Sequence, residues 1–69
     1  MDTDRTRLAA LIAEQGPMFG REIRCELQWN FGRLHDAVNA QPGRWFVMTA
    51  NGWDFTELGL AAANENTPD

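Results

Sequence analysis

The sequence predicts a small α+β domain in which three helices are followed by a β-hairpin and a short final helix. Two observations indicate this class. Apolar residues recur at helical spacing through the first half of the chain, and the stretch WFVMTANGWDF then alternates around Asn51-Gly52. Asn-Gly flanked by alternating apolar residues is a strong hairpin signal, because both residues tolerate positive φ. An isolated hairpin is marginal in water, so it must pack against the helices.

The length of the chain allows only one domain. At 69 residues there is no room for a second hydrophobic core. We expect a single domain over residues 1–69, with an ordered core at about 4–63 and a polar tail at 64–69 that frays.

The first predicted helix runs roughly from Asp4 to Gln15. Thr3 or Asp4 can cap its start, and Gly16-Pro17 is a helix stop. The second helix is about two turns long within FGREIRCELQ, and the third lies within WNFGRLHDAVNAQPG, where Asn30 is a favoured N-cap and Pro42-Gly43 closes the helix. The apolar stripe of the third helix comprises Phe31, Leu34, Ala37 and Val38.

The hairpin is predicted to pair Arg44–Ala50 with a strand from Trp53 to about Thr56, and Thr56 caps the last helix within TELGLAAAN. One hairpin face carries Trp45, Val47 and Thr49, the other carries Phe46 and Met48, and one of the two must cover the helices. Trp29 lies in a turn and is expected to be partly exposed. The remaining predicted core is Leu8, Leu11, Ile12, Ile23, Leu27, Leu34 and Val38.

The charge is distributed unevenly along the chain. The formal net charge of −4 argues against nucleic acid as a partner, since that class of protein favours basic faces. Six of the ten acidic residues lie near the two ends, however. Between Arg5 and Trp53 six arginines face four acidic residues, a local charge of +2, so DNA binding stays open.

Several functional classes find no support in the residues. His35 and Asp36 are adjacent, but neighbours on a helix point apart and no nucleophile accompanies them, so we expect no enzyme. A single Cys25 gives neither an internal disulfide nor a metal site, and we read it as a buried structural residue. We expect no cofactor. Without a long apolar run, we expect neither a signal peptide nor a membrane span, and therefore a cytoplasmic protein.

This order of elements resembles a winged helix-turn-helix domain, the fold of many small bacterial and phage transcription regulators. The resemblance covers roughly Arg7 to Ala63. LIAEQGPMFGREI is similar to a helix-turn-helix entry, NFGRLHDAV stands in the place of a recognition helix, WFVMTANGWDF matches the wing, and FTELGLAA resembles the exit of multiple-antibiotic-resistance repressors. The sequence departs from this pattern at Phe19, where a small capping residue is usual, and at the uncharged wing tip.

The resemblance implies binding to double-stranded DNA, with the third helix in the major groove and the wing on the flanking backbone. An arginine can pair with guanine and an asparagine with adenine, while Asp36 can accept from cytosine or orient Arg33. Arg44 is the best candidate for a phosphate contact. The expected DNA-binding residues are Asn30, Gly32, Arg33, Asp36 and Asn39 on the third helix and its cap, with Arg21, Arg24, Arg44 and Asn51 outside it.

Each of these assignments has an alternative. Arg33 and Asp36 can form an ion pair on a solvated face, and the arginines of the second helix can pair with Glu22 and Glu26. The whole chain can instead be an acidic winged-helix module that binds a protein partner, for example as a phage inhibitor that mimics DNA. A DNA-binding module this small would act best as a homodimer, for which the last helix offers Leu58, Leu60 and Ala61–Ala63.

Overall fold

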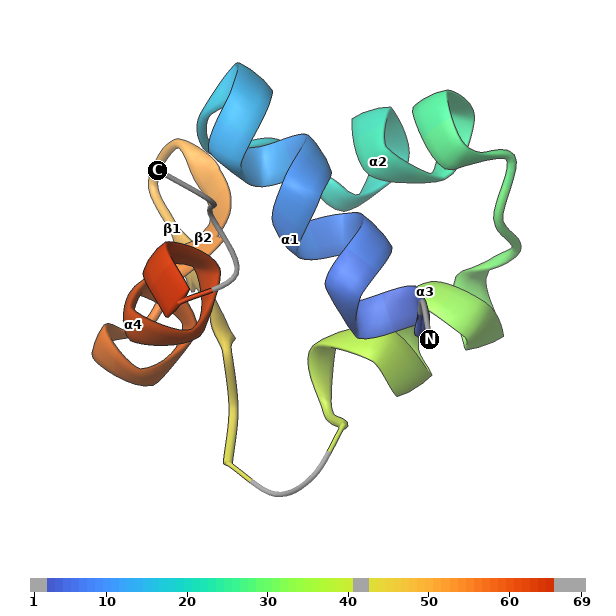
Figure 1. The fold of residues 1–69 in the computed structure, drawn as a ribbon. Helices are drawn as coiled ribbons and strands as arrows, with labels where there is room; N and C mark the ends of the chain where they lie inside the picture. The colour runs from blue at the N-terminus through green and yellow to red at the C-terminus, as the bar shows by residue number, and fades with distance from the viewer. Residues whose placement is uncertain (1–2, 41–42, 66–69) are drawn as a thin grey trace.

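The computed structural model describes residues 3–40 and 43–65 and confirms a small α+β domain with three helices, a two-stranded antiparallel hairpin and a C-terminal helix. Helix α1 lies in the middle of the molecule, with α2 and α3 on one side and the hairpin and α4 on the other (Figure 1). The predicted helix stop at Pro42 and the tail from residue 66 lie outside the described residues. The elements are α1 Asp4–Gln15, α2 Gly20–Leu27, α3 Phe31–Val38, β1 Phe46–Thr49, β2 Gly52–Phe55 and α4 Glu57–Glu65.

Three helices begin with the side-chain caps that the sequence predicts: α1 at Thr3, α3 at Asn30 and α4 at Thr56. Of the two candidates at α1, Thr3 is the cap, and its Oγ1 accepts from the Thr6 amide at 3.1 Å. Thr56 Oγ1 accepts from the Gly59 amide at the start of α4. At α2 the N-cap residue is Phe19, which has no side-chain oxygen to accept from the helix. Glu22 instead reaches back, and its Oε1 accepts from the Phe19 amide at 3.0 Å.

The hairpin turns one residue earlier than predicted. Thr49 pairs with Gly52, so the turn residues are Ala50 and Asn51 rather than Asn51 and Gly52, and β1 is shorter than the predicted strand. Neither turn residue has a positive φ, since Gln28 is the only non-glycine with one among the described residues. The Thr49 hydroxyl stabilises this turn: it donates to the Gly52 carbonyl at 2.7 Å and accepts from the Asn51 amide at 3.2 Å.

The reason for the shift lies outside the hairpin, in the turn between α1 and α2. Met18 pairs with Trp53 as an antiparallel bridge, with N–O distances of 3.2 and 2.6 Å. This pairing presses the backbone of Met18 against Gly52, which has a φ of 115°. A Cβ at position 52 would lie 2.7 Å from the Phe19 nitrogen, closer than real contacts allow. At the first residue of β2, glycine is therefore needed both for the close approach of Met18 and for the positive φ.

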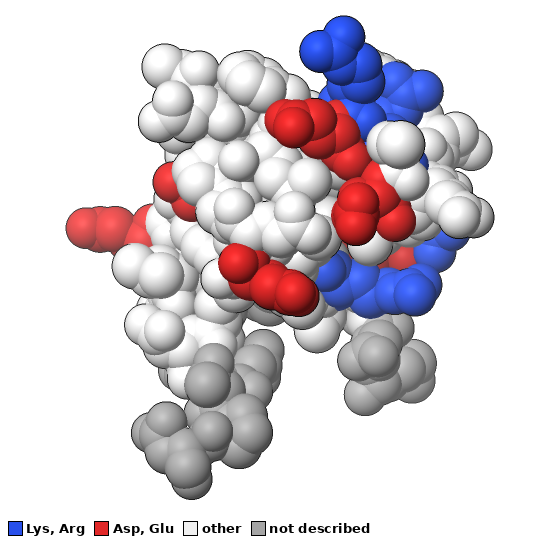
Figure 2. Space-filling view, turned by 90° about the horizontal axis from the view of Figure 1, so that it is seen from above, with Lys and Arg blue, Asp and Glu red and all other residues white. Residues whose placement is uncertain are grey.

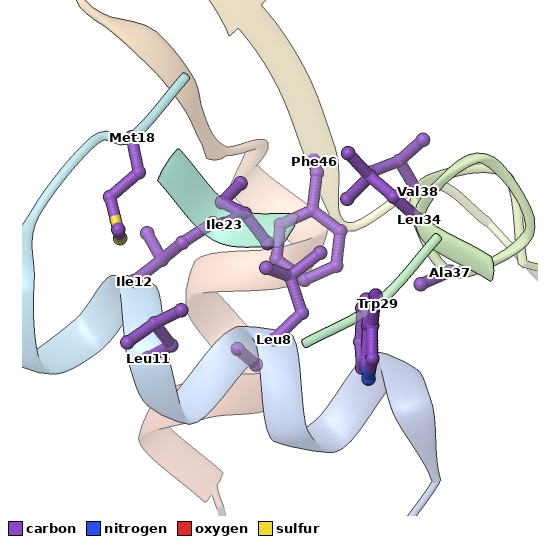
Figure 3. Packing of buried hydrophobic residues seen from close by; sticks show 11 residues of the cluster. Leu8, Leu11, Ile12, Met18, Ile23, Trp29, Leu34, Ala37, Val38 and Phe46 are labelled. Atoms are coloured by element: carbon purple, nitrogen blue, oxygen red, sulfur yellow. The ribbon is translucent and has the colours of Figure 1, made fainter. Parts of the chain in front are cut away.

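The core lies between α1, the other helices and the first residue of β1 (Figure 3). Phe46 is at its centre and is 1% exposed. Every residue of the predicted helical core is buried except Leu27, which is half-buried against the cluster. Of the two hairpin faces, the one that carries Phe46 contributes the buried side chain, while Met48, on the same face, is half-exposed because β1 leaves the core after its first residue.

Three predictions about burial are wrong. Phe31 was expected in the apolar stripe of α3 but is 66% exposed, whereas Trp29 was expected to be partly exposed but is buried. The larger Trp29 packs in the core just before α3 begins, so the first turn of the helix starts outside it. Cys25 is exposed instead of buried. It lies about 200° around α2 from Ile23, and a helix of two turns has only one buried stripe.

Candidate functional site

The cap of α3 occupies one of the predicted DNA contacts. Asn30 Oδ1 accepts from the Arg33 amide at 2.8 Å, as a helix N-cap does. At the other end of the helix, Asn39 Nδ2 donates to the carbonyl of His35 at 2.9 Å. Both asparagines of the predicted DNA-binding set at α3 therefore have hydrogen bonds within the helix and its caps.

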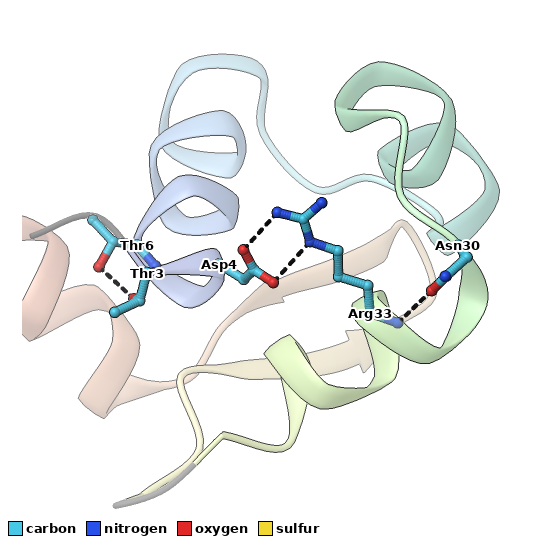
Figure 4. Close-up of polar contacts among 5 residues, drawn as sticks. All are labelled: Thr3, Asp4, Thr6, Asn30 and Arg33. Carbon is cyan, nitrogen blue, oxygen red and sulfur yellow. Dashed lines mark hydrogen bonds and ion pairs between the residues drawn. The ribbon is translucent and has the colours of Figure 1, made fainter.

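Arg33 is held by the first turn of α1. Its Nε and Nη2 donate to the two carboxylate oxygens of Asp4 at 2.9 and 3.0 Å, a bidentate pair (Figure 4). Its guanidinium also lies 5.1 Å from the ring centre of Trp29. The hydrogen bond to Arg33 lowers the pKa of Asp4 below its ordinary value of 3.8, and the same bond raises the pKa of Arg33. Arg33 thus joins α3 to α1, and Asp36 lies instead 4.0 Å from Nδ1 of His35.

The Asp4–Arg33 pair gives an expectation for the pH dependence of stability. The pKa of the Asp4 carboxyl is lower in the folded chain than in the unfolded chain, so the pair stabilises the fold above pH 3.8 and loses this effect as the pH falls through the folded-state pKa. Both side chains are exposed, so we expect a small contribution. Wild type should melt at a higher temperature than Asp4→Asn at neutral pH, and the difference should disappear in strong acid.

Thermal melts of the two proteins at neutral and acidic pH measure this difference. Asp36→Asn is the control, because it removes the same charge from a carboxylate whose recorded contact is with His35. If the difference in melting temperature between wild type and Asp4→Asn stays constant down to strong acid, the substitution acts on α1 itself, and the ion pair is not the cause.

The charged side chains form no continuous basic surface on the face that Figure 2 shows. Seen from the top of Figure 1, basic and acidic side chains alternate there beside a broad uncharged area. Arg21 on α2 and Arg44 before β1 are exposed, as is Asn51 in the hairpin turn. Gly32 and Asp36 are exposed on α3. Most of the predicted DNA-binding residues are therefore exposed, but Arg33, the arginine predicted to contact a base, is in an ion pair with Asp4.

A groove of about 280 Å³ lies between α2, α3 and the hairpin. Its floor is apolar, and two half-exposed or exposed side chains, Phe31 and Met48, stand at its edges. The lining residues are Gly20, Arg21, Arg24, Phe31, Leu34, His35, Val38, Asn39, Met48 and Trp53.

The groove brings together residues that the sequence analysis assigned to different roles. Arg21, Arg24 and Asn39 were predicted DNA contacts, whereas Phe31 and Met48 were candidates for burial. The sequence holds a signal only for Phe31, which directly follows the N-cap Asn30 and therefore stands in the first turn of α3. Met48 is an interior residue of β1, and nothing local marks it as exposed. A second hollow of about 260 Å³ lies beside the start of α1, lined by Thr3, Asp4, Arg5, Asp36, Ala37 and Ala40.

Comparison with known proteins identifies no relative. Neither the protein-family models, nor the curated proteins, nor the solved structures include a match to this chain. In the described part of the chain, no helix has the length and apolar character needed to cross a bilayer, and no group of three or more His, Cys, Asp or Glu side chains is arranged to hold a metal ion.

Proposed function

We propose that this chain is a winged-helix module that binds another protein through the groove. The observation that carries the proposal is the exposed apolar groove itself. Phe31 is 66% and Met48 50% exposed, and both line the groove together with Trp53. Aromatic residues, methionine and arginine are the types enriched at the centres of protein interfaces, and the groove contains all three.

The charge around α3 supports a protein partner over DNA. A DNA interface is strongly positive and wet. Here Arg33 is paired with Asp4, Asp36 is exposed on the same helix, and the chain has a net charge of −4. An apolar floor gives a phosphate backbone nothing to bind, whereas it suits an apolar side chain of a peptide.

The test is a selection of short peptides from a display library against the full chain, followed by titration of the selected peptides in solution. Met48→Ala is expected to weaken binding on the order of tenfold, the effect of a residue worth somewhat more than 1 kcal/mol at an interface. Val47→Ala is the matched control, since Val47 is 45% exposed on the other face of the same strand. Val47→Ala should leave binding unchanged. Peptides that bind all three proteins equally, or no selected peptide at all, would refute the proposal.

DNA binding is the second candidate, favoured by the exposure of Arg21 and Arg44. In this case two copies would pair through α4, where Leu58 and Leu60 are about half-exposed, and act as a regulator of transcription. An exposed ion pair is weak, so DNA can displace Asp4 from Arg33. Titration with random duplex DNA at low and physiological salt tests this candidate. Binding that falls steeply with salt, and that Arg44→Ala weakens on every duplex with a salt slope reduced by about one, would establish it.

A further inference from the structure

The edge of the groove is positive on a chain that is negative overall. Arg21 and Arg24 of α2 line it, and none of the lining residues is an aspartate or glutamate. The net charge of the chain is −4, so this absence of carboxylates is local to the groove. Such an edge attracts a negatively charged segment and repels a positive one.

Arg24 adds a directional feature to this charge. Its Nε is buried and has no hydrogen-bond partner among the described residues. The guanidinium lies 5.8 Å from the centre of the Phe31 ring, so the side chain is held over one wall of the groove. A guanidinium offers donors in a planar fork that fits the two oxygens of a carboxylate. A carboxylate supplied by a bound partner can accept from the guanidinium at the groove, and a small rotation of the side chain toward that carboxylate would also give Nε the acceptor that it lacks.

The size of the groove limits what else the partner inserts. Its volume of about 280 Å³ lies just below the roughly 300–1,000 Å³ of pockets that enclose whole small molecules. The floor is formed by Leu34, Val38 and Trp53. One large apolar side chain, flanked by the chain that carries it, fits this space better than a cofactor does.

From these observations we propose that the groove binds an acidic peptide segment that inserts one large apolar side chain and places a carboxylate on Arg24. This inference rests on the proposed function and specifies its ligand. Neither half of the recognition suffices alone. The apolar floor does not select for charge, and the two arginines, Arg21 exposed and Arg24 half-buried, do not select for an apolar residue.

The experiment titrates the full chain with fluorescein-labelled synthetic peptides that share one tryptophan anchor. In the first peptide glutamates flank the anchor, in the second glutamines replace them, and in the third serine replaces the tryptophan while the glutamates stay. We expect the first peptide to bind most tightly, and to lose affinity as salt is added. The second and third should each bind on the order of tenfold more weakly, since a hydrogen bond to a charged group and a buried aromatic anchor each contribute at least that factor.

Variants of the protein test the position of the carboxylate. Arg24→Gln should weaken the glutamate peptide on the order of tenfold and leave the glutamine peptide unchanged. Arg44→Gln makes the same change in net charge outside the groove and should affect neither peptide strongly. Because Arg24 is half-buried, Arg21→Gln on the exposed side of α2 serves as a second variant, and far-ultraviolet circular dichroism checks the fold of each.

The outcomes separate this inference from the proposed function. If the glutamine peptide binds as tightly as the glutamate peptide and Met48→Ala weakens both, the groove is a protein-binding site but its ligand is not acidic. If library-selected peptides do not depend on Met48, the proposed function itself is wrong. If the chain dimerises in sedimentation and Met48→Ala makes it monomeric, the groove binds a second copy, and the acidic-segment inference falls.

Discussion

Replacing Phe46 with alanine should leave this protein mostly unfolded at physiological temperature. Phe46 is 1% exposed, lies at the centre of the core and stacks on Phe55 with ring centres 5.8 Å apart. Phe-to-Ala substitutions in cores cost about 3–5 kcal/mol. A domain of this length has a total stability of roughly 3–10 kcal/mol at about 0.05–0.15 kcal/mol per residue, so the loss removes a large part of it.

Denaturant and thermal unfolding followed by circular dichroism measure the effect on Phe46→Ala. The control is Val47→Ala, a change at the next residue of the same strand, whose side chain is 45% exposed. We expect this control to unfold close to wild type. A Phe46→Ala protein that melts with the wild type would mean that the hairpin does not cover the helices as the structure has it.

The second large effect is expected at Gly59, in the first turn of α4. A Cβ there would lie 2.8 Å from both the carbonyl carbon and the Cα of Trp45, with the carbonyl oxygen closer still. Backbone cannot rotate away as the end of a side chain does. That same oxygen accepts from the Thr56 amide at 2.9 Å, so the clash also strains the start of the helix. Gly59→Ala should therefore destabilise at the upper end of the usual range for overpacking, about 1–3 kcal/mol or more.

Gly32, in the first turn of α3, is the matched control for Gly59. A Cβ at position 32 would meet only Asn30 Oδ1, at an ordinary 3.7 Å. Because alanine favours helix over glycine, Gly32→Ala should stabilise the protein by up to about 1 kcal/mol. The two substitutions are chemically identical and should shift the melting temperature in opposite directions. Equal stabilisation by both would show that α4 does not pack against the Trp45 carbonyl.

Features with local causes were predicted correctly from the sequence. The caps at Thr3, Asn30 and Thr56 depend on residues three positions away, and the structure contains all three hydrogen bonds. The apolar stripes predicted for the helices are also buried where they pack against α1. The burial of Cys25 was wrong for a local reason, its position on α2 away from Ile23. The failed prediction of the hairpin turn depends on a contact between distant segments. The hairpin turn moved because Met18 pairs with Trp53, and no local signal in Asn51-Gly52 reports that pairing.

The candidate site was predictable only in its parts. The sequence places Arg21 and Arg24 on one short helix and Met48 on a strand, but not the groove that they share. The ion pair of Arg33 could not be chosen from the sequence either, since Asp36 lies three residues away on the same helix while Asp4 lies on another. Exposed side chains have several partners within reach, and small energies decide between them.

The Met18–Trp53 pairing also determines how the groove meets a ligand. Trp53 belongs to its floor, and two backbone hydrogen bonds fasten that residue to the turn between α1 and α2. The hairpin therefore cannot fray as a separate ribbon, and amide protons at both residues should exchange with solvent only when the whole domain opens. A surface fixed in this way loses little conformational entropy when a partner docks, so the cost of ordering falls on the incoming segment.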